Sequence, residues 1–149
     1  MSTTIRHAVS TTIRQSRPTD DAFIAGLARR VFVEYTPTPS VGRGETLLAI
    51  SRHGPVGFVT LNTAGAWAAV MAIAVDPAEQ GRGIGRSLMR AVEQRARARG
   101  VRRIELHTAQ ANLAAIDLFQ KLGFRIEKRV ERFYARGQNA CLMVKGLER

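Results

Sequence analysis

A glycine-rich segment at residues 75–86 carries the clearest chemical pattern in the sequence. It reads Val-Asp-Pro-Ala-Glu-Gln-Gly-Arg-Gly-Ile-Gly-Arg and joins a predicted buried strand to the start of a predicted helix. The backbone N–H groups of such a turn point in one direction, and the helix dipole adds positive potential. Glycines let a bulky anion approach the backbone, and Arg82 and Arg86 add positive charge. The segment therefore predicts a site for phosphate groups.

Two common phosphate-binding patterns do not fit this segment. A dinucleotide-binding fingerprint needs a third glycine three residues after the second, where this sequence has Arg86 or Leu88. A Walker A loop needs a terminal Gly-Lys-Ser or Gly-Lys-Thr, which this segment lacks. The pattern that does fit is Gln80-x-x-Gly83-x-Gly85.

A second block, residues 112–124, reads Asn-Leu-Ala-Ala-Ile-Asp-Leu-Phe-Gln-Lys-Leu-Gly-Phe. Together with Gln-x-x-Gly-x-Gly after a Val-Asp-Pro strand end, it resembles the paired motifs of the GNAT superfamily of N-acetyltransferases. The family's second motif is Asn-x-x-Ala-hydrophobic-x-Leu-Tyr-x-x-x-Gly-Phe. The resemblance covers residues 12–147. It implies an enzyme that moves the acetyl group of acetyl-CoA directly to a primary amine of a small molecule or protein, without a metal.

The resemblance implies a role for each part of the cofactor site. The backbone N–H groups of residues 81–86 would hold the pyrophosphate, and residues 73–75 would hydrogen-bond the pantetheine arm as an added strand. The N–H of Ile73 would lie where negative charge grows on the thioester oxygen. Asn112 would contact the pantetheine arm. The cofactor-binding residues implied are Ile73, Ala74, Val75, Gln80, Gly81, Arg82, Gly83, Ile84, Gly85, Arg86, Asn112 and Phe119.

The base that takes the proton from the amine varies among members of this family. One common position, a glutamate in the strand before the phosphate turn, corresponds here to Ala69. Another lies five residues before the motif asparagine, where this sequence has His107. A histidine titrates near neutral pH and could accept the proton directly or through water. The alternative is a structural histidine at the end of a strand.

The residue expected to protonate the leaving thiolate differs from the family pattern. The tyrosine that often protonates the leaving thiolate is replaced by Phe119, which has no proton to give. Tyr134 is the nearest substitute, and otherwise the thiolate leaves unaided. The catalytic residues implied are thus His107, Ile73 and Tyr134. An inactive acetyl-CoA-binding sensor remains the alternative function for a chain without the tyrosine.

The acceptor is expected near residues 32–44, which follow the first predicted helix, and near the last hairpin. Glu34, Tyr35 and Tyr134 are the candidate substrate-binding residues, and Glu45 is a further residue that could select an amine. The sequence does not identify the acceptor. A strongly basic chain repels a highly cationic acceptor at long range.

Hydrophobic periodicity predicts the elements that position these residues. Predicted strands span residues 12–15, 46–51, 56–61, 66–75, 101–108, 124–134 and 140–147, and predicted helices span residues 22–35, 83–99 and 112–122. The apolar run 66–75 is predicted to be buried on both faces. With the resemblance, the order predicts an α/β (α+β) fold. It has a mixed, mostly antiparallel sheet of about six to seven strands, flanked by helices, with a splayed parallel pair at the cofactor site.

The bulk properties are those of a single domain. The chain has 149 residues, and we expect a flexible extension over residues 1–10 and one N-acetyltransferase domain over residues 11–149. Its lone cysteine, Cys141, is compatible with the cytoplasm. No apolar run is long enough to cross a membrane.

The formal charge of +11 suits a phosphate-rich cofactor but also a basic nucleic-acid-binding module. That module would not explain the paired glycine motifs, so nucleic acid is not an expected partner; a homodimer stays open.

Overall fold

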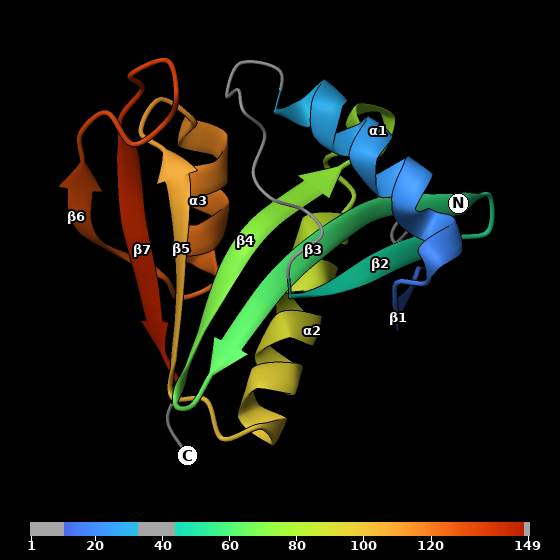
Figure 1. Ribbon diagram of the computed structural model, residues 1–149, viewed down its shortest axis with the longest axis horizontal. Helices are drawn as coiled ribbons and strands as arrows, with labels where there is room; N and C mark the ends of the chain where they lie inside the picture. Colours follow the sequence, from blue (N-terminus) through green and yellow to red (C-terminus); the bar gives the residue numbers. More distant parts are fainter. Residues whose placement is uncertain (1–10, 33–43, 148–149) are drawn as a thin grey trace, which may run out of the picture.

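The computed structural model describes residues 11–32 and 44–147. Figure 1 shows one sheet with helices on both of its faces. The strands are β1 (Thr12–Gln15), β2 (Glu45–Ser51), β3 (Gly54–Ala64), β4 (Trp67–Val75), β5 (Arg103–Ala109), β6 (Arg125–Val130) and β7 (Ala140–Gly146). The helices are α1 (Asp21–Val31), α2 (Ile84–Ala98) and α3 (Leu113–Lys121), with short 3₁₀ turns at Pro18–Asp20 and Pro77–Glu79.

The seven strands form one sheet in the order β1-β2-β3-β4-β5-β7-β6. All neighbouring strands in it are antiparallel except β4 and β5, which are parallel. This arrangement confirms the predicted mixed, mostly antiparallel α/β fold.

Two apolar clusters hold the helices to opposite faces of the sheet. On one face Leu27 of α1 packs with Phe58 and Ala72 of the sheet. On the other face Leu88 of α2 and Phe119 of α3 belong to the larger cluster. Because residues alternate between faces along a strand, one strand contributes to both clusters.

The parallel pair of strands separates part of the way along. β4 pairs with β5 only where residues 67–70 face residues 103–106. A β-bulge in β4 lies at the same level, because Leu61 of β3 faces Val70 whereas Thr60 faces Ala72. Bulges bend and twist a strand, and Figure 1 shows β4 and β5 close together at their starts and diverging toward their ends. The predicted splayed pair is therefore present.

Three details differ from the predicted elements. The strand β4 is not buried on both faces, since Trp67 and Met71 are 46% and 37% exposed. The helix α1 ends at Val31 rather than at Tyr35, and residues 33–35 lie outside the described part of the chain. The strand β6 ends at Val130, because the chain turns at Arg132, whose φ is +50°.

Candidate active site

The turn after β4 has the open backbone that the glycines predicted. Gly81 and Gly83 have φ angles of +82° and +83°, which L side chains rarely adopt. A Cβ atom built on either glycine would meet no atom within 4 Å, so the space beside them is open. The turn is closed from within by two side chains. Asp76 Oδ1 accepts a hydrogen bond from the N–H of Ala78 at 3.0 Å, and Gln80 Nε2 donates to the carbonyl of Val75 at 3.2 Å.

The N-terminus of α2 completes this turn as an anion site. Gly83 is the N-cap, and the first helical hydrogen bond runs from the N–H of Ser87 to the carbonyl of Gly83 at 3.0 Å. The N–H groups of residues 84–86 therefore have no partner within the helix. The side chain of Ile84 is buried and anchors the helix start in the core. A phosphate group fits here, since the donors and the open glycine backbone lie together.

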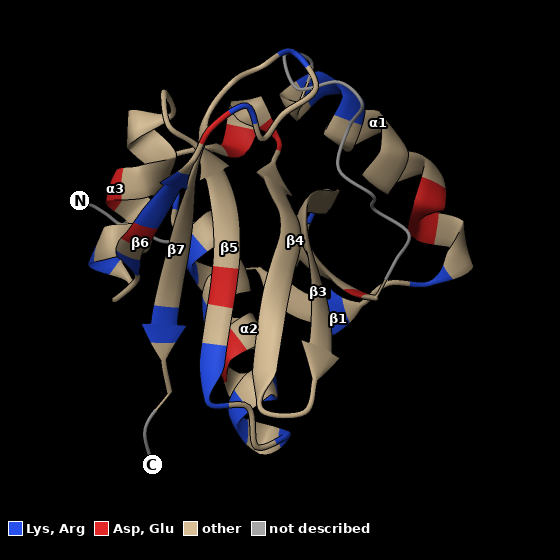
Figure 2. Ribbon diagram, turned by 60° about the vertical axis from the view of Figure 1, so that its left-hand side comes forward, with Lys and Arg blue, Asp and Glu red and all other residues tan. Residues whose placement is uncertain are grey.

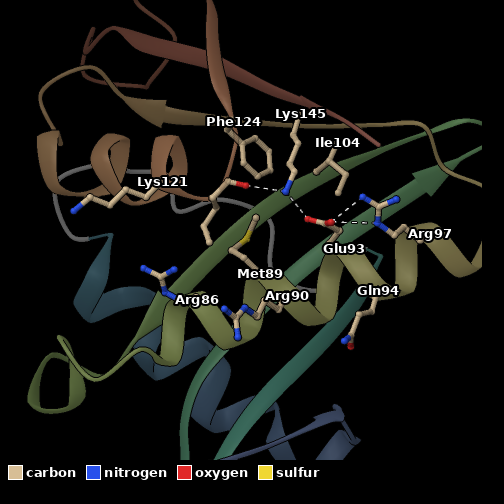
Figure 3. A pocket seen from close by; sticks show the side chains of 11 residues that line it. Arg86, Met89, Arg90, Glu93, Gln94, Arg97, Ile104, Lys121, Phe124 and Lys145 are labelled. Atoms are coloured by element: carbon tan, nitrogen blue, oxygen red, sulfur yellow. Dashed lines mark hydrogen bonds and ion pairs between the residues drawn. The ribbon is translucent and has the colours of Figure 1, made fainter. Parts of the chain in front are cut away.

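The two arginines of the motif occupy different positions. Arg82 forms an ion pair with Glu79 at 3.5 Å within the turn. Arg86 lines a hollow of about 410 Å³ between α2 and α3. Figure 3 shows the side chains of Arg86 and Arg90 projecting from neighbouring turns of α2. Arg86 is therefore within one turn of the predicted pyrophosphate position.

Residues 73–75 form the wall of the gap between β4 and β5. Ile73, Ala74 and Val75 pair with Val59, Phe58 and Gly57 of β3 on one side only. Their other side faces β5, which has no pairing with β4 beyond Val70. In an antiparallel strand, alternate residues direct their N–H and C=O groups away from a given partner. This exposed strand edge is what an added pantetheine strand would require, although the hydrogen-bonding role of each residue stays a prediction.

The second motif builds α3 and part of the core. Asn112 is the N-cap of α3, and its Oδ1 accepts a hydrogen bond from the N–H of Ala115 at 3.1 Å. Phe119 is 3% exposed and its ring meets that of Phe124 edge-to-face, with centroids 6.0 Å apart. Both residues thus have a structural role, and their predicted contacts with the cofactor stay predictions.

His107 lies at the point where the two strands separate. It follows directly after Leu106, the last residue of β5 that pairs with β4. The ring of Phe133 stacks on the imidazole with centroids 4.2 Å apart and planes inclined by 10°. Loss of solvent around the ring lowers the pKa of His107 below 6.5; the carboxylate of Glu105 opposes this shift, and Lys128 adds to it. The imidazole is therefore neutral and able to accept a proton at neutral pH.

Tyr134 joins the same aromatic group from the connection between β6 and β7. Its ring meets that of Phe133 edge-to-face, with centroids 5.0 Å apart. The prediction that a strand over residues 124–134 contains Phe133 and Tyr134 is wrong, because both residues lie beyond the end of β6. His107 and Tyr134 are thus brought together through Phe133, whose role the sequence pattern did not indicate. Of the other acceptor residues predicted, Glu34 and Tyr35 lie outside the described residues. Glu45 is described, and it forms ion pairs with Arg95 and Arg99.

Comparison with known proteins identifies the family to which this site belongs. The family model described as the acetyltransferase (GNAT) family matches residues 17–124. The chain belongs to the GNAT acetyltransferase family.

Relatives of known sequence match a shorter part of this GNAT chain. Mycothiol acetyltransferase of Streptosporangium roseum is 51% identical over 55 residues, which are 37% of this chain and 16% of that protein. The enzyme of the same name from Nocardia farcinica is 44% identical over 55 residues, or 37% and 18% of the two chains. The match thus spans less than a fifth of these relatives.

Solved structures match nearly the whole GNAT chain. The ribosomal-protein-S18-alanine N-acetyltransferase of Escherichia coli has a TM-score of 0.79 and 22% identity, and the match covers 94% of this chain and 96% of that one. The yncA protein of Salmonella typhimurium, solved with its cofactor acetyl-CoA, has a TM-score of 0.79 and 18% identity, covering 94% and 95%. At these identities the likeness shows the fold alone, and it confirms the predicted GNAT fold.

Two further observations concern the described part of the GNAT domain. No helix within it is both long and apolar enough to cross a membrane. Residues 11–32 and 44–147 contain no group of three or more histidine, cysteine, aspartate or glutamate side chains that could hold a metal ion.

Proposed function

We propose that this chain binds acetyl-CoA along the turn after β4 and transfers the acetyl group directly to a primary amine. The observation that carries the proposal is the continuity of the site. The open glycine turn leads into the unpaired edge of β4, and His107 lies where that gap begins. A phosphate cradle, a strand edge and a neutral base thus follow one another along one path.

Different residues of the chain bind the cofactor, stabilise the developing charge and accept the proton. The N–H groups of residues 81–86 bind the pyrophosphate, and residues 73–75 align the pantetheine arm. A backbone N–H at Ile73 stabilises the negative charge that grows on the thioester oxygen as the amine attacks. His107 takes the proton from the ammonium, and its pKa below 6.5 keeps it in the neutral form that this step needs.

The leaving thiolate needs no strong acid. A thiol pKa lies only about 1–2 units above neutral pH, so a coenzyme A thiolate is a fair leaving group. The N-terminus of α2 and the arginines near it supply positive potential. We propose that the thiolate leaves without a proton from Tyr134, since that ring contacts Phe133 in the connection between β6 and β7.

The chain is further proposed to work in the cytoplasm, with acetyl-CoA and an amine as its partners. The free and buried thiol of Cys141 supports a reducing compartment. A homodimer remains a proposal that the oligomeric state in solution would test.

The test combines cofactor binding with a thiol-release assay. Calorimetry should detect binding of acetyl-CoA to the full chain, and a panel of primary amines should include acceptors that release free coenzyme A. Binding without turnover of any amine would favour the acetyl-CoA sensor. No binding of acetyl-CoA, with tight binding of nucleic acid, would favour the basic binding module and overturn the proposal.

A further inference from the structure

We propose that Glu105 binds the ammonium group of the acceptor, and that the acceptor is consequently an amine with one positive charge and an apolar body. This inference rests on the proposed function and names the substrate class of the same site. It is carried by the position of Glu105 in the sheet, by the weakness of its ion pair, and by the residues around it.

Glu105 lies on the face of the sheet that α2 and α3 leave uncovered. Its neighbours Ile104 and Leu106 belong to the core cluster beneath α2, so Glu105 and His107 are on the opposite face. Residues two apart on a strand are separated by about 6.5 Å. An ammonium ion between the two side chains can therefore donate to the Glu105 carboxylate while it remains within reach of the His107 imidazole.

Glu105 lies in a row of paired residues that crosses the sheet from β5 to β3, and its small neighbour in this row leaves the carboxylate accessible. Glu105 faces Ala69 of β4, and Ala69 faces Asn62 of β3. The methyl group of Ala69 is too short to cover the carboxylate beside it. Figure 2 shows β4 without any charged residue next to β5, which bears both an acidic and a basic band. Since Glu105 is the acidic residue of β5, the row offers a cation one carboxylate and no competing cationic side chain on β4.

The charge of Glu105 is only weakly satisfied within the described residues. Its ion pair with Arg103 Nε is 3.8 Å long, and its side chain is 26% exposed. Arg103 has a much closer partner, since its Nη2 lies 2.5 Å from Oε1 of Glu127. The described part of the chain donates no hydrogen bond to Glu105 that would compete with a ligand. A half-buried carboxylate in this state is suited to binding one cation.

The surroundings of Glu105 favour an acceptor with an apolar body and no second charge. Phe133 stacks on His107 and keeps 44% of its surface exposed, and Trp67 on β4 is 46% exposed. Lys128 acts on His107 through its charge, and it would repel a second cationic group. Glu127 is already held by Arg103. A singly charged amine with an aromatic or aliphatic body therefore matches this face best.

The reaction at this site balances without another reagent. The bound ammonium gives one proton to the His107 imidazole, and its freed lone pair forms the C–N bond to the thioester carbonyl carbon. The C–S bond breaks, and the thiolate leaves with the electron pair. The nitrogen of the adduct gives its second proton to solvent water, so the products are a neutral amide and a coenzyme A thiolate. Glu105 positions the amine and does not take the proton.

The experiment uses phenethylamine as the acceptor probe and 2-phenylethanol as its uncharged counterpart. Binding of each to the full chain saturated with coenzyme A is measured by calorimetry, and acetylation of phenethylamine is followed by thiol release. The test variant is Glu105→Gln. The matched control is Asp117→Asn, which removes the same charge from an exposed carboxylate on α3 that pairs with Lys121.

Glu105→Gln should weaken phenethylamine binding by about ten- to a hundredfold, as expected for the loss of a hydrogen bond to a charged group. It should raise KM far more than it lowers kcat, and Glu105→Asp should recover part of the loss. Binding of 2-phenylethanol should stay unchanged in Glu105→Gln, and Asp117→Asn should bind both probes like the original chain.

Three outcomes would overturn the assignment. Phenethylamine could bind Glu105→Gln as tightly as the original chain, or both probes could weaken together, which would mean a structural role. The original chain could also acetylate other amines without binding phenethylamine. If it binds acetyl-CoA but acetylates no amine, the proposed function fails instead, and phenethylamine binding still decides the role of Glu105.

Discussion

His107 illustrates, at the scale of single residues, how an environment selects a protonation state. Stacking by Phe133 removes solvent from one face of the imidazole, and this desolvation disfavours the charged form. Glu105 raises the pKa and Lys128 lowers it, and the sum leaves the pKa of His107 below 6.5. The proton-accepting form therefore predominates at neutral pH.

The pH dependence of turnover tests this assignment. The acid limb of the kcat/KM profile should have its midpoint below pH 6.5, because the neutral imidazole is lost only when pH falls through the lowered pKa. Lys128→Gln should move that midpoint upward, since removing a nearby cation favours the protonated form. His107→Ala should lower turnover by about 10²–10⁴-fold while acetyl-CoA binding is kept. An unchanged acid limb in His107→Ala would exclude the histidine as the base.

Phe119 provides a second prediction, because its burial changes what a restored tyrosine would do. A hydroxyl added to a ring that is 3% exposed must lose its water, at a cost of about 1–3 kcal/mol if no partner is found. Phe119→Tyr should therefore lower the free energy of unfolding in urea and give no gain in turnover. Phe133→Tyr is the control, because that ring is 44% exposed and its new hydroxyl stays in water. A more active and equally stable Phe119→Tyr variant would show that the hydroxyl reaches the leaving sulfur.

How far the sequence predicts single residues depends on how local their constraints are. The glycines of the phosphate turn were predictable, since a turn and a helix start depend on neighbours in sequence. The capping by Asn112 is equally local. The stacking of Phe133 on His107 was not predictable, because it joins a strand to a distant connection. The proposed role of Glu105 could not be predicted either, because it depends on the pairing of Glu105 with the small residue Ala69 on β4.

The same distinction holds for the helices and strands. The helix predicted over residues 83–99 is α2, Ile84–Ala98, with a glycine at each end. The burial of β4 was mispredicted, because an apolar run does not reveal which faces are covered. Here α1 packs on the part that contains Ala72 and Ala74, whereas Trp67 lies beyond it. The bulge that starts the splay likewise depends on pairing with β3.

Lys145 connects three elements at the hollow between α2 and α3. Its Nζ lies 2.6 Å from Oε1 of Glu93 on α2 and donates to the carbonyl of Leu122 at 2.8 Å. Figure 3 shows these contacts, together with the bonds from Arg97 to Glu93. Partial burial raises the pKa of Glu93, but the hydrogen bonds from Lys145 and Arg97 outweigh it and hold the pKa below its usual value.

Removing this connection should destabilise the domain. Lys145→Met should lower the free energy of unfolding by about 1–3 kcal/mol at pH 7, because a partly buried charged group and a carbonyl lose their partner. The pKa of Glu93 is lowered in the folded state, so this contribution is present above its unfolded pKa and is lost as pH falls through the folded pKa. The cost of Lys145→Met should therefore shrink in acid.

Urea unfolding at neutral and acidic pH measures this effect. Lys121→Met is the matched control, since Lys121 pairs with Asp117 at 3.0 Å but both side chains are more than 60% exposed. Such surface pairs contribute little. Equal stability of the two variants at pH 7 would show that Lys145 does not hold α2 and α3 to the sheet.

For the whole molecule, the main question is how the formal charge of +11 is used. Part of it is neutralised within the fold, since Glu45 pairs with both Arg95 and Arg99. The arginines of the phosphate turn and of the first turns of α2 lie near the open glycine backbone. An excess of positive charge there attracts an anion carrying several phosphate groups over distances of about 10 Å or less at ordinary ionic strength. Acetyl-CoA binding should therefore weaken as the salt concentration rises.

A substitution in the turn separates this general attraction from the specific cradle. Gly83→Asp should abolish measurable acetyl-CoA binding, because its side chain enters the open space beside the backbone and brings a like charge to the pyrophosphate. Two unit charges about 4 Å apart repel by about 4 kcal/mol near a protein surface, which corresponds to about a thousandfold in affinity.

Gly100→Asp is the control at the other end of α2. Its φ of +77° and open surroundings match those of Gly83, so it imposes similar strain and the same change in net charge. Calorimetry should show nearly normal binding in Gly100→Asp and none in Gly83→Asp. If both variants weaken binding equally, the net charge of the molecule governs affinity, and the turn after β4 is not the phosphate site.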